Sequence, residues 1–357
     1  MNLNDIVRIR LNNQQVENTL LKTPKSVVSW MGAIQAQDYP MAKWAVGIRS
    51  SSAEQAVEEA LNKGEIIRTH VLRPTWHLAA AADIRWMLML TAPAIKRQIA
   101  SYARKLEADD NILKRCNIII EKALRGHQHL TRTELMMILN KKGIVTNDFR
   151  SALIMMSAEL DAIVCNGSMK GKEFTYALMD EKIPAVKKLK KDEALAALAD
   201  RYFKSHGPAT LKDFIWWSGL AVADAKTALE LVKSNFISET IGLETYWFSS
   251  GLTPAIKKSS LYLLPAFDEF LISYKDRAAA ISADHQKKAF TANGIFKPII
   301  VKNGIVTGVW RRTVKKNDLL IEIELFHPQD KTTISQIENS AKAFGNFLNK
   351  KAELKFV

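Results

Sequence analysis

The sequence has few of the residues that mark secreted, membrane or metal-binding proteins. Its 357 residues include two cysteines, Cys116 and Cys165, which exclude a disulfide scaffold and have no zinc-ligand spacing. No apolar run is long and uncharged enough to predict a membrane span, and Met1 to Asp5 does not begin a secretory signal. A glycine-rich phosphate loop, a nucleophile elbow and a histidine cluster with metal-ligand spacing are also missing. We therefore expect a cytoplasmic protein without a metal or other cofactor.

Acidic residues are few relative to basic ones. The chain has 51 Lys and Arg against 37 Asp and Glu, a formal net charge of +14, and a pI near 9.6. Such an excess favours polyanionic partners, nucleic acid above all, although a merely soluble lysine-rich protein is the alternative. With 47% apolar and 25% charged residues, the composition is that of a globular chain with a substantial core.

The order helix, helix, β-hairpin occurs three times along the chain, and this is the order of a winged helix-turn-helix. In the first unit, 1–125, a helix from Thr23 through Ile34 is expected to end at Tyr39-Pro40. A second helix over 52–62 and an extended ribbon over 66–78 follow it. The second unit, 126–186, has helices starting near 129 and 147 and a hairpin over 162–178. In the third unit, 187–256, helices are predicted near 206–214 and 221–234, with a hairpin over 236–248.

The last segment, 257–357, has a different pattern. Four strand-like runs are predicted over 261–265, 295–301, 305–312 and 319–326, and a closing amphipathic helix over 333–348. Asn303-Gly304 predicts a tight hairpin turn between two of the strands. The predicted fold class is thus α+β, with three tandem winged-helix units and a C-terminal β-rich α+β domain. The lysine-rich stretch Lys187 to Asp192 is either a linker or the solvated start of a helix.

Two glutamines, Gln35 and Gln37, flank Ala36 directly after the first predicted helix. In a regular helix they would point about 200° apart, but at a helix end both can converge on one water molecule. Pro40 predicts a helix end here, and a helix C-terminus carries partial negative charge that favours a developing cation. Surface glutamines on a frayed helix are the alternative.

Three further groups are candidates for contacts with DNA or for supporting the site. The ribbon carries groups that bind anions or stack on bases, namely Arg68, His70, Arg73, Trp76 and His77. The alternative interpretation of the ribbon is a half-buried hairpin whose polar groups form hydrogen bonds with one another. Arg311 and Arg312 either grip a phosphate backbone or keep an edge strand soluble. Asp268 is expected to have a structural or positioning role, because the adjacent carboxylates of Asp268 and Glu269 on a strand would face opposite ways. Trp216 and Trp217 are expected in the core.

Together these residues resemble the AlkZ/YcaQ family of bacterial winged-helix DNA glycosylases over nearly the whole chain. The resemblance is carried by four segments: Gln35 to Pro40, Arg68 to Leu78, Leu263 to Leu271, and Gly308 to Arg312. It implies a C-shaped DNA cradle and excision of N-alkylated purines, with unhooking of interstrand crosslinks in some members. It also implies that Gln35 and Gln37 are the catalytic pair that holds the attacking water.

Two functions follow as hypotheses. The first is a monofunctional DNA glycosylase that acts on double-stranded DNA with alkylated bases, as a monomer associated with the bacterial nucleoid. The second is a non-catalytic winged-helix DNA-binding protein or transcription regulator. Gln37 discriminates between them, since a regulator has no need of it.

Overall fold

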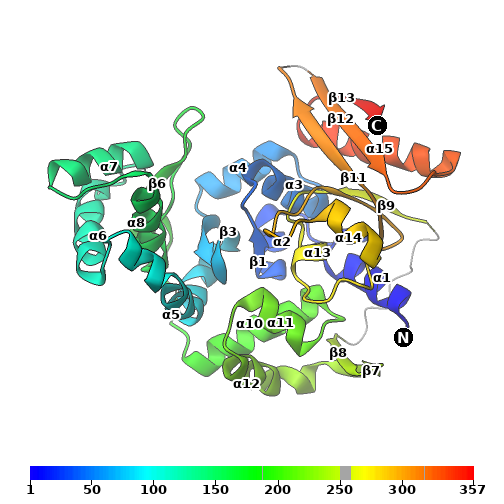
Figure 1. The fold of residues 1–357 in the computed structure, drawn as a ribbon, viewed down its shortest axis with the longest axis horizontal. Coiled ribbons are helices and arrows are strands. Elements are labelled where there is room, and N and C mark those ends of the chain that lie inside the picture. The colour runs from blue at the N-terminus through cyan, green and yellow to red at the C-terminus, as the bar shows by residue number, and fades with distance from the viewer. Residues whose placement is uncertain (187, 250–258, 317) are drawn as a thin grey trace.

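The computed structural model describes residues 1–186, 188–249, 259–316 and 318–357. In these residues helices alternate with four sheets, so the mixed α+β class is confirmed. Figure 1 shows a lobe with α6, α7 and α8 at one side, the long helix α5 leading to it, and the sheet with β11, β12 and β13, coloured orange to red, at the other side. Within the described ranges, no helix is both long enough and apolar enough to cross a membrane.

The N-terminal part contains five helices and a three-stranded sheet, ordered β1-β3-β2. Its elements are α1 (Leu3–Asn13), α2 (Pro24–Met31), β1 (Ala33–Gln35), α3 (Tyr39–Ser50), α4 (Glu54–Asn62), β2 (Ile66–Val71), β3 (Arg73–Ala80) and α5 (Ala81–Lys105). The helix expected through Ile34 instead ends at Met31, because Gly32 follows it with a φ of 75°. Pro40 does not end that helix: it lies in the first turn of α3, where a proline removes no helical hydrogen bond.

The next part forms the lobe that contains α7 and α8. Its elements are α6 (Asp110–Leu124), β4 (Leu130–Thr131), α7 (Arg132–Lys141), α8 (Asp148–Leu160), β5 (Val164–Asn166), β6 (Thr175–Leu178) and α9 (Met179–Lys182). The expected hairpin forms by antiparallel pairing of β5 with β6, and β4 adds to the other side of β6. The buried side of α6, around Cys116 and Ile120, shares one core with α7 and α8, so its packing favours the second unit over the first.

The third part follows the same order. It consists of α10 (Lys191–His206), α11 (Leu211–Ser218), α12 (Val222–Val232), a 3-10 turn (Lys233–Asn235), β7 (Ile237–Ile241) and β8 (Glu244–Phe248). The last two strands pair around Gly242 as expected. Of the lysine-rich stretch, Lys187 lies outside the described residues, and Lys191 is the first residue of α10.

The C-terminal part is built on a five-stranded sheet, ordered β13-β12-β11-β10-β9. Its elements are β9 (Leu261–Leu264), α13 (Glu269–Ile272), α14 (Ala283–Ala289), β10 (Ile299–Lys302), β11 (Ile305–Val314), β12 (Asp318–Leu325), α15 (Lys331–Phe347) and β13 (Lys351–Phe356). The turn at Asn303-Gly304 joins β10 to β11 as predicted. β13 was not expected; it runs parallel to β12 after the α15 crossover.

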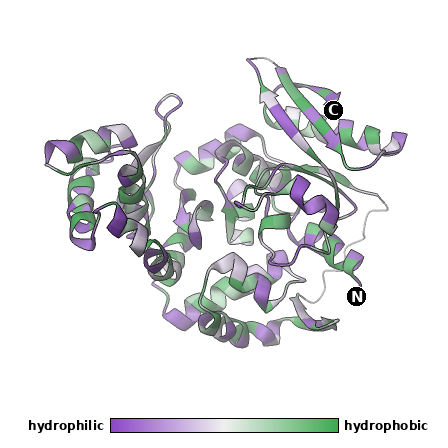
Figure 2. Ribbon diagram, viewed as in Figure 1, coloured by the Kyte–Doolittle hydropathy of each residue, from purple (hydrophilic) through white to green (hydrophobic). Residues whose placement is uncertain are grey.

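Hydrophobic cores extend across the predicted unit boundaries. One core joins α2, α3 and α4 to the C-terminal sheet and includes Trp44, Trp310 and Phe344. Another joins α5 to the helices of the third part around Tyr202 and Trp217. Figure 2 shows hydrophilic residues along the outer rims of the helices and hydrophobic ones between the elements. The parts thus pack as one body around the N-terminal sheet, which carries the glutamine motif.

Candidate active site

The glutamine motif lies at the end of a strand and in the loop that follows it. Gln35 is the last residue of β1 and pairs with His77 of β3, while the Ala36 amide donates to the Trp76 carbonyl at 2.7 Å. Asp38 then caps α3 by accepting a hydrogen bond from the Met41 amide. The predicted position at a helix C-terminus is therefore wrong. The helix end beside the motif is an N-terminus, whose partial charge is positive.

The two glutamines are joined by one hydrogen bond and differ in exposure. The side-chain Oε1 of Gln35 accepts from the backbone amide of Gln37 at 2.9 Å. Gln35 is only 3% exposed, whereas Gln37 is exposed and lines a cleft. The buried glutamine thus fixes the loop, and the exposed one faces solvent.

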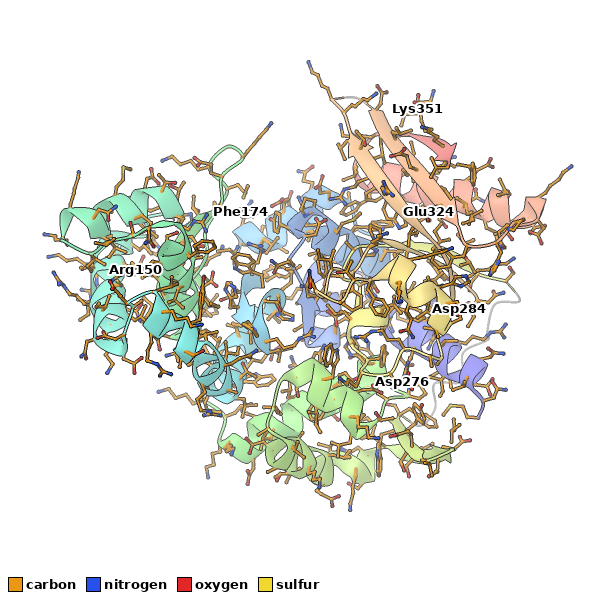
Figure 3. The ribbon with its side chains drawn as sticks, in the orientation of Figure 1. Arg150, Phe174, Asp276, Asp284, Glu324 and Lys351 are labelled. Atoms are coloured by element: carbon orange, nitrogen blue, oxygen red, sulfur yellow. The ribbon has the colours of Figure 1, made fainter. Side chains whose placement is uncertain are left out.

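The cleft beside Gln37 has a volume of about 950 Å³. It is bounded by the start of α3, by α4, by the turn of the β5–β6 hairpin and by Phe267. Figure 3 places Phe174 where this hairpin faces α4 and β3, and its ring meets that of Tyr39 edge-on at 5.0 Å. Both positive and negative side chains line the cleft: Asp38, Lys43, Glu58, Arg68 and Lys172. The first two parts of the chain therefore form opposite walls of one site.

Arg68 ties the ribbon to the centre of the motif. Its Nε and Nη2 donate to the Ala36 carbonyl at 3.3 and 3.2 Å. Its guanidinium lies 4.6 Å from the ring centre of Trp76 and 4.8 Å from that of Phe174. Burial lowers the pKa of Arg68. Arg68 thus lines the cleft beside Gln37, and together with the half-buried Trp76 it also lines a second pocket along the β5–β6 hairpin, where the sequence predicted contacts with DNA.

The two ribbon histidines are buried, which argues against the direct DNA contacts expected of them. His70 is hydrogen-bonded through Nδ1 to Glu159, and its ring packs on Trp76 at 4.5 Å. His77 has no exposed surface, and its Nδ1 lies 3.0 Å from the Thr75 carbonyl. Burial, and next the charge of Arg73, lower the pKa of His77 to about 3, so this ring is neutral at pH 7. For His70 the interpretation as a hairpin with internally satisfied polar groups is closer to the structure, whereas the buried Nε2 of His77 has no hydrogen-bond partner among the described residues.

The sequence reasoning missed Glu269, a buried carboxylate behind the motif. Its Oε1 accepts from the Gln35 amide at 2.7 Å, and its Oε2 accepts from Trp217 Nε1 at 3.2 Å and from the Ser273 hydroxyl. Burial alone would raise the pKa of Glu269, but the neighbouring His206, whose Nε2 lies 3.7 Å from Oε2, and the Ser273 hydroxyl lower it to about 2. Glu269 is thus ionised and holds β1 in place. An acidic pair within the apolar run 263–272 was the available signal, because a buried carboxylate needs partners.

Asp268 has a structural environment and is not among the residues lining the cleft. It begins α13 by accepting from the Phe270 amide, and both its oxygens bind the Arg49 guanidinium at 2.8 and 2.9 Å. Neither side chain of this pair is more than 1% exposed. The pair fixes the start of α13, which places the neighbouring Glu269 against Gln35. A positioning role for Asp268 stays a prediction, and the structure indicates that it would act on Gln35 through α13 and Glu269.

Arg311 and Arg312 point away from each other, because neighbours on a strand alternate sides. Arg312 Nη2 lies 3.3 Å from Asp38 Oδ1, next to the motif. Arg311 is exposed and lies 3.9 Å from Glu324. β11 is an inner strand between β10 and β12, so the edge-strand alternative is wrong. Of the two, only Arg312 is brought to the candidate site.

The matches to known proteins agree with this arrangement. The family model "DNA glycosylase AlkZ-like" matches residues 28–347, and the chain belongs to this family of DNA glycosylases. It is 22% identical over 318 residues to the "Interstrand DNA cross-link repair glycosylase" of Streptomyces sahachiroi, with 84% of this chain and 85% of that protein covered. The solved structure "Streptomyces sahachiroi DNA glycosylase AlkZ" superposes with a TM-score of 0.83 at 19% identity, over all of both chains. That likeness supports the fold.

Proposed function

We propose that this chain is a monofunctional DNA glycosylase that hydrolyses the N-glycosidic bond of purines alkylated at N7 or N3. One observation carries the proposal: the Gln35–Gln37 hydrogen bond holds Gln37 at a cleft in a chain of this family. In this proposal the Gln37 amide binds the attacking water, and Gln35 fixes the loop that presents it.

The chemistry needs positioning and electrostatics more than a strong base. A purine alkylated at N7 is cationic, so the C1′–N9 bond breaks with its electron pair leaving on the purine. The sugar becomes an oxocarbenium ion, and the water held by Gln37 adds to C1′. The protonated adduct is a strong acid and loses its proton to solvent water. An undamaged, neutral purine stays a poor leaving group, and this gives selectivity.

The negative potential for this cation comes from carboxylates, not from a helix end. Asp38 lines the cleft next to Gln37, and its side chain is 33% exposed. Its Oδ1 is used by the Met41 amide and by Arg312, which hold the carboxylate in place. Glu269 adds a second negative charge behind Gln35. Both act in our proposal as fixed charges and not as nucleophiles.

We also propose the architecture that this function uses. The three helix–helix–hairpin parts act as winged-helix units of a C-shaped cradle for double-stranded DNA, with boundaries near 1–125, 126–186, 187–256 and 257–357. The packing of α6 supports moving the first boundary to the end of α5. We further propose a monomer in the bacterial cytoplasm, bound to the nucleoid, since one chain already supplies several DNA-facing parts.

Base release tests the proposal. The substrate is a DNA duplex with N7-methylguanine, and the proteins are the wild type, Gln35→Ala, Gln37→Ala and the exposed control Gln98→Ala. We expect release by the wild type and the control, and its loss in both motif variants. If none of the four proteins, including the wild type, releases the base although all of them bind DNA, the result would favour a non-catalytic DNA-binding protein. The name of the Streptomyces relative, an interstrand DNA cross-link repair glycosylase, makes an interstrand crosslink the second substrate to test.

A further inference from the structure

Three cationic side chains gather around the ring of Trp216, which is only partly buried although the sequence placed it in the core. The ammonium of Lys275 lies 4.9 Å from the ring centre, and the guanidinium carbons of Arg277 and Arg73 lie 5.4 and 5.7 Å from it. They come from separate parts of the chain: Arg73 from β3, Trp216 from α11, and the other two from the segment after α13. Asp276, labelled in Figure 3, marks this junction. We call these four residues the Trp216 cluster.

The cations of the Trp216 cluster lack ionic partners in the described part of the chain. None of the three takes part in an ion pair there, whereas the buried cations Arg10, Lys43 and Arg49 each do. Arg73 Nε and Nη2 and Arg277 Nη2 are buried atoms without a hydrogen-bond partner among the described residues. Unpaired guanidinium nitrogens are costly in a protein interior, so a group that accepts from them is expected.

Nearby acidic groups do not neutralise the Trp216 cluster. Asp213 accepts from the Lys275 amide and lies 3.8 Å from Arg10, and Asp276 accepts from the Ala278 amide. Burial, and next the charge of Arg73, lower the pKa of Arg277 to about 10, so the Arg277 guanidinium stays charged at pH 7. The mutual repulsion of the cations in the cluster is relieved by an anion that binds between them.

The Trp216 cluster adjoins the candidate active site. Arg73, Thr75 and His77 alternate along β3 and share one face, and His77 is the strand partner of Gln35. On the other side, Arg277 lies 5.1 Å from the ring of Phe296, which contacts the cleft residue Phe267 at 6.4 Å. Lys275 is the exposed member of the cluster, and the other three residues are partly buried beside it.

From this geometry we propose that the Trp216 cluster binds a phosphate group, and that the group is a backbone phosphodiester of the DNA strand that carries the lesion. Guanidinium forks match phosphate oxygens in shape and charge, and phosphate contacts fix the register of a protein on DNA. This inference rests on the proposed function for the identity of the DNA. It concerns binding, however, and not the glycosidic bond.

A phosphate scan tests the proposal. Single phosphates near an N7-methylguanine are replaced by neutral methylphosphonates, and affinity is measured for wild type, Arg277→Gln, Lys275→Gln and the exposed control Lys351→Gln. We expect one phosphate whose replacement weakens binding by wild type and control but has no effect on Arg277→Gln. The slope of log K against log salt should also fall by about 1 in Arg277→Gln and in Lys275→Gln, and less in the control.

The scan has results that overturn the proposal. If each methylphosphonate changes the DNA affinity of all four proteins by the same factor, the proposal is overturned. Inorganic phosphate alone could also stabilise the wild type against unfolding but not Arg277→Gln. If, in addition, the methylphosphonate scan were the same for both proteins, the cluster would be assigned to a free phosphate instead. If Arg277→Gln does not fold, the result for Lys275→Gln tests the proposal instead, because the Lys275 side chain is exposed and does not pack in a core. Base release is measured separately, so a failed glycosylase assay leaves the binding result valid.

Discussion

Replacing the buried carboxylate of Glu269 by an amide should destabilise the protein far more than its small size suggests. The carboxylate accepts from three donors: the Gln35 amide, Trp217 Nε1 and the Ser273 hydroxyl. A glutamine there has one acceptor oxygen. If that oxygen stays with Gln35, its NH₂ group meets the indole N–H, which can only donate, and the Ser273 hydroxyl, which can rotate and accept. The indole N–H is then left unpaired, and a buried unpaired donor costs about 1–3 kcal/mol, so we expect Glu269→Gln to lower the free energy of unfolding by about 1–3 kcal/mol.

Urea unfolding measures this loss, and the exposed Glu353→Gln serves as control, with an expected change within about 0.5 kcal/mol. A double-mutant cycle sharpens the test. Ser273→Ala should cost about 1.5–3 kcal/mol in the wild type, where it removes a bond to a charge, and much less beside Glu269→Gln. Equal stability of Glu269→Gln and wild type, or an unchanged cost of Ser273→Ala, would refute the assignment of Glu269 as an ionised, fully bonded support.

Three further predictions concern the motif and its surroundings. Gln35→Ala should lower the melting temperature, because it leaves the Gln37 amide unpaired, whereas Gln37→Ala should leave it unchanged; equal melting temperatures would contradict the division of roles. Asp38→Asn keeps a residue that caps helices, so stability should stay within about 0.5 kcal/mol while base release falls; undiminished release would exclude the charge from the mechanism. His77 has a folded pKa of about 3, below its unfolded value of about 6.5. The unfolded state therefore binds the extra proton, and the free energy of unfolding decreases as the pH is lowered from about 6.5 toward 3. The slope should approach about 1.4 kcal/mol per pH unit and shrink in His77→Asn, as pH-dependent urea unfolding would show.

Local patterns in the sequence were enough to predict most of the α+β fold. The hairpins around Gly242 and Asn303-Gly304 depend on turn residues that favour one backbone geometry, and both form. β13 was missed because it pairs with β12 only after α15 has packed on the sheet, and no local signal encodes that contact. The apolar spacing of α2 continues to Ile34 although the helix ends at Met31, because Gly32 adopts a positive φ that spacing alone does not encode, and Pro40 belongs to the first turn of α3.

The candidate site was found from the sequence only in part. The motif residues Gln35 and Gln37 do lie together, but on a strand and loop and not on a helix. The partners of the motif come from distant parts of the chain: Glu269 from α13 and Arg312 from β11. Such contacts depend on how whole elements pack, so residue spacing cannot predict them. The burial of His70 has the same origin, since its ring is hydrogen-bonded to Glu159 of α8.

The hydrogen bond between Gln35 and Glu269 joins residues that are 234 positions apart. During synthesis, the motif therefore leaves the ribosome long before the carboxylate that supports it has been made. An unfinished chain can fold its early helices, yet its motif loop stays without the buried anchor until α13 has emerged and docked. The timing of translation thus withholds the supported motif from incomplete chains.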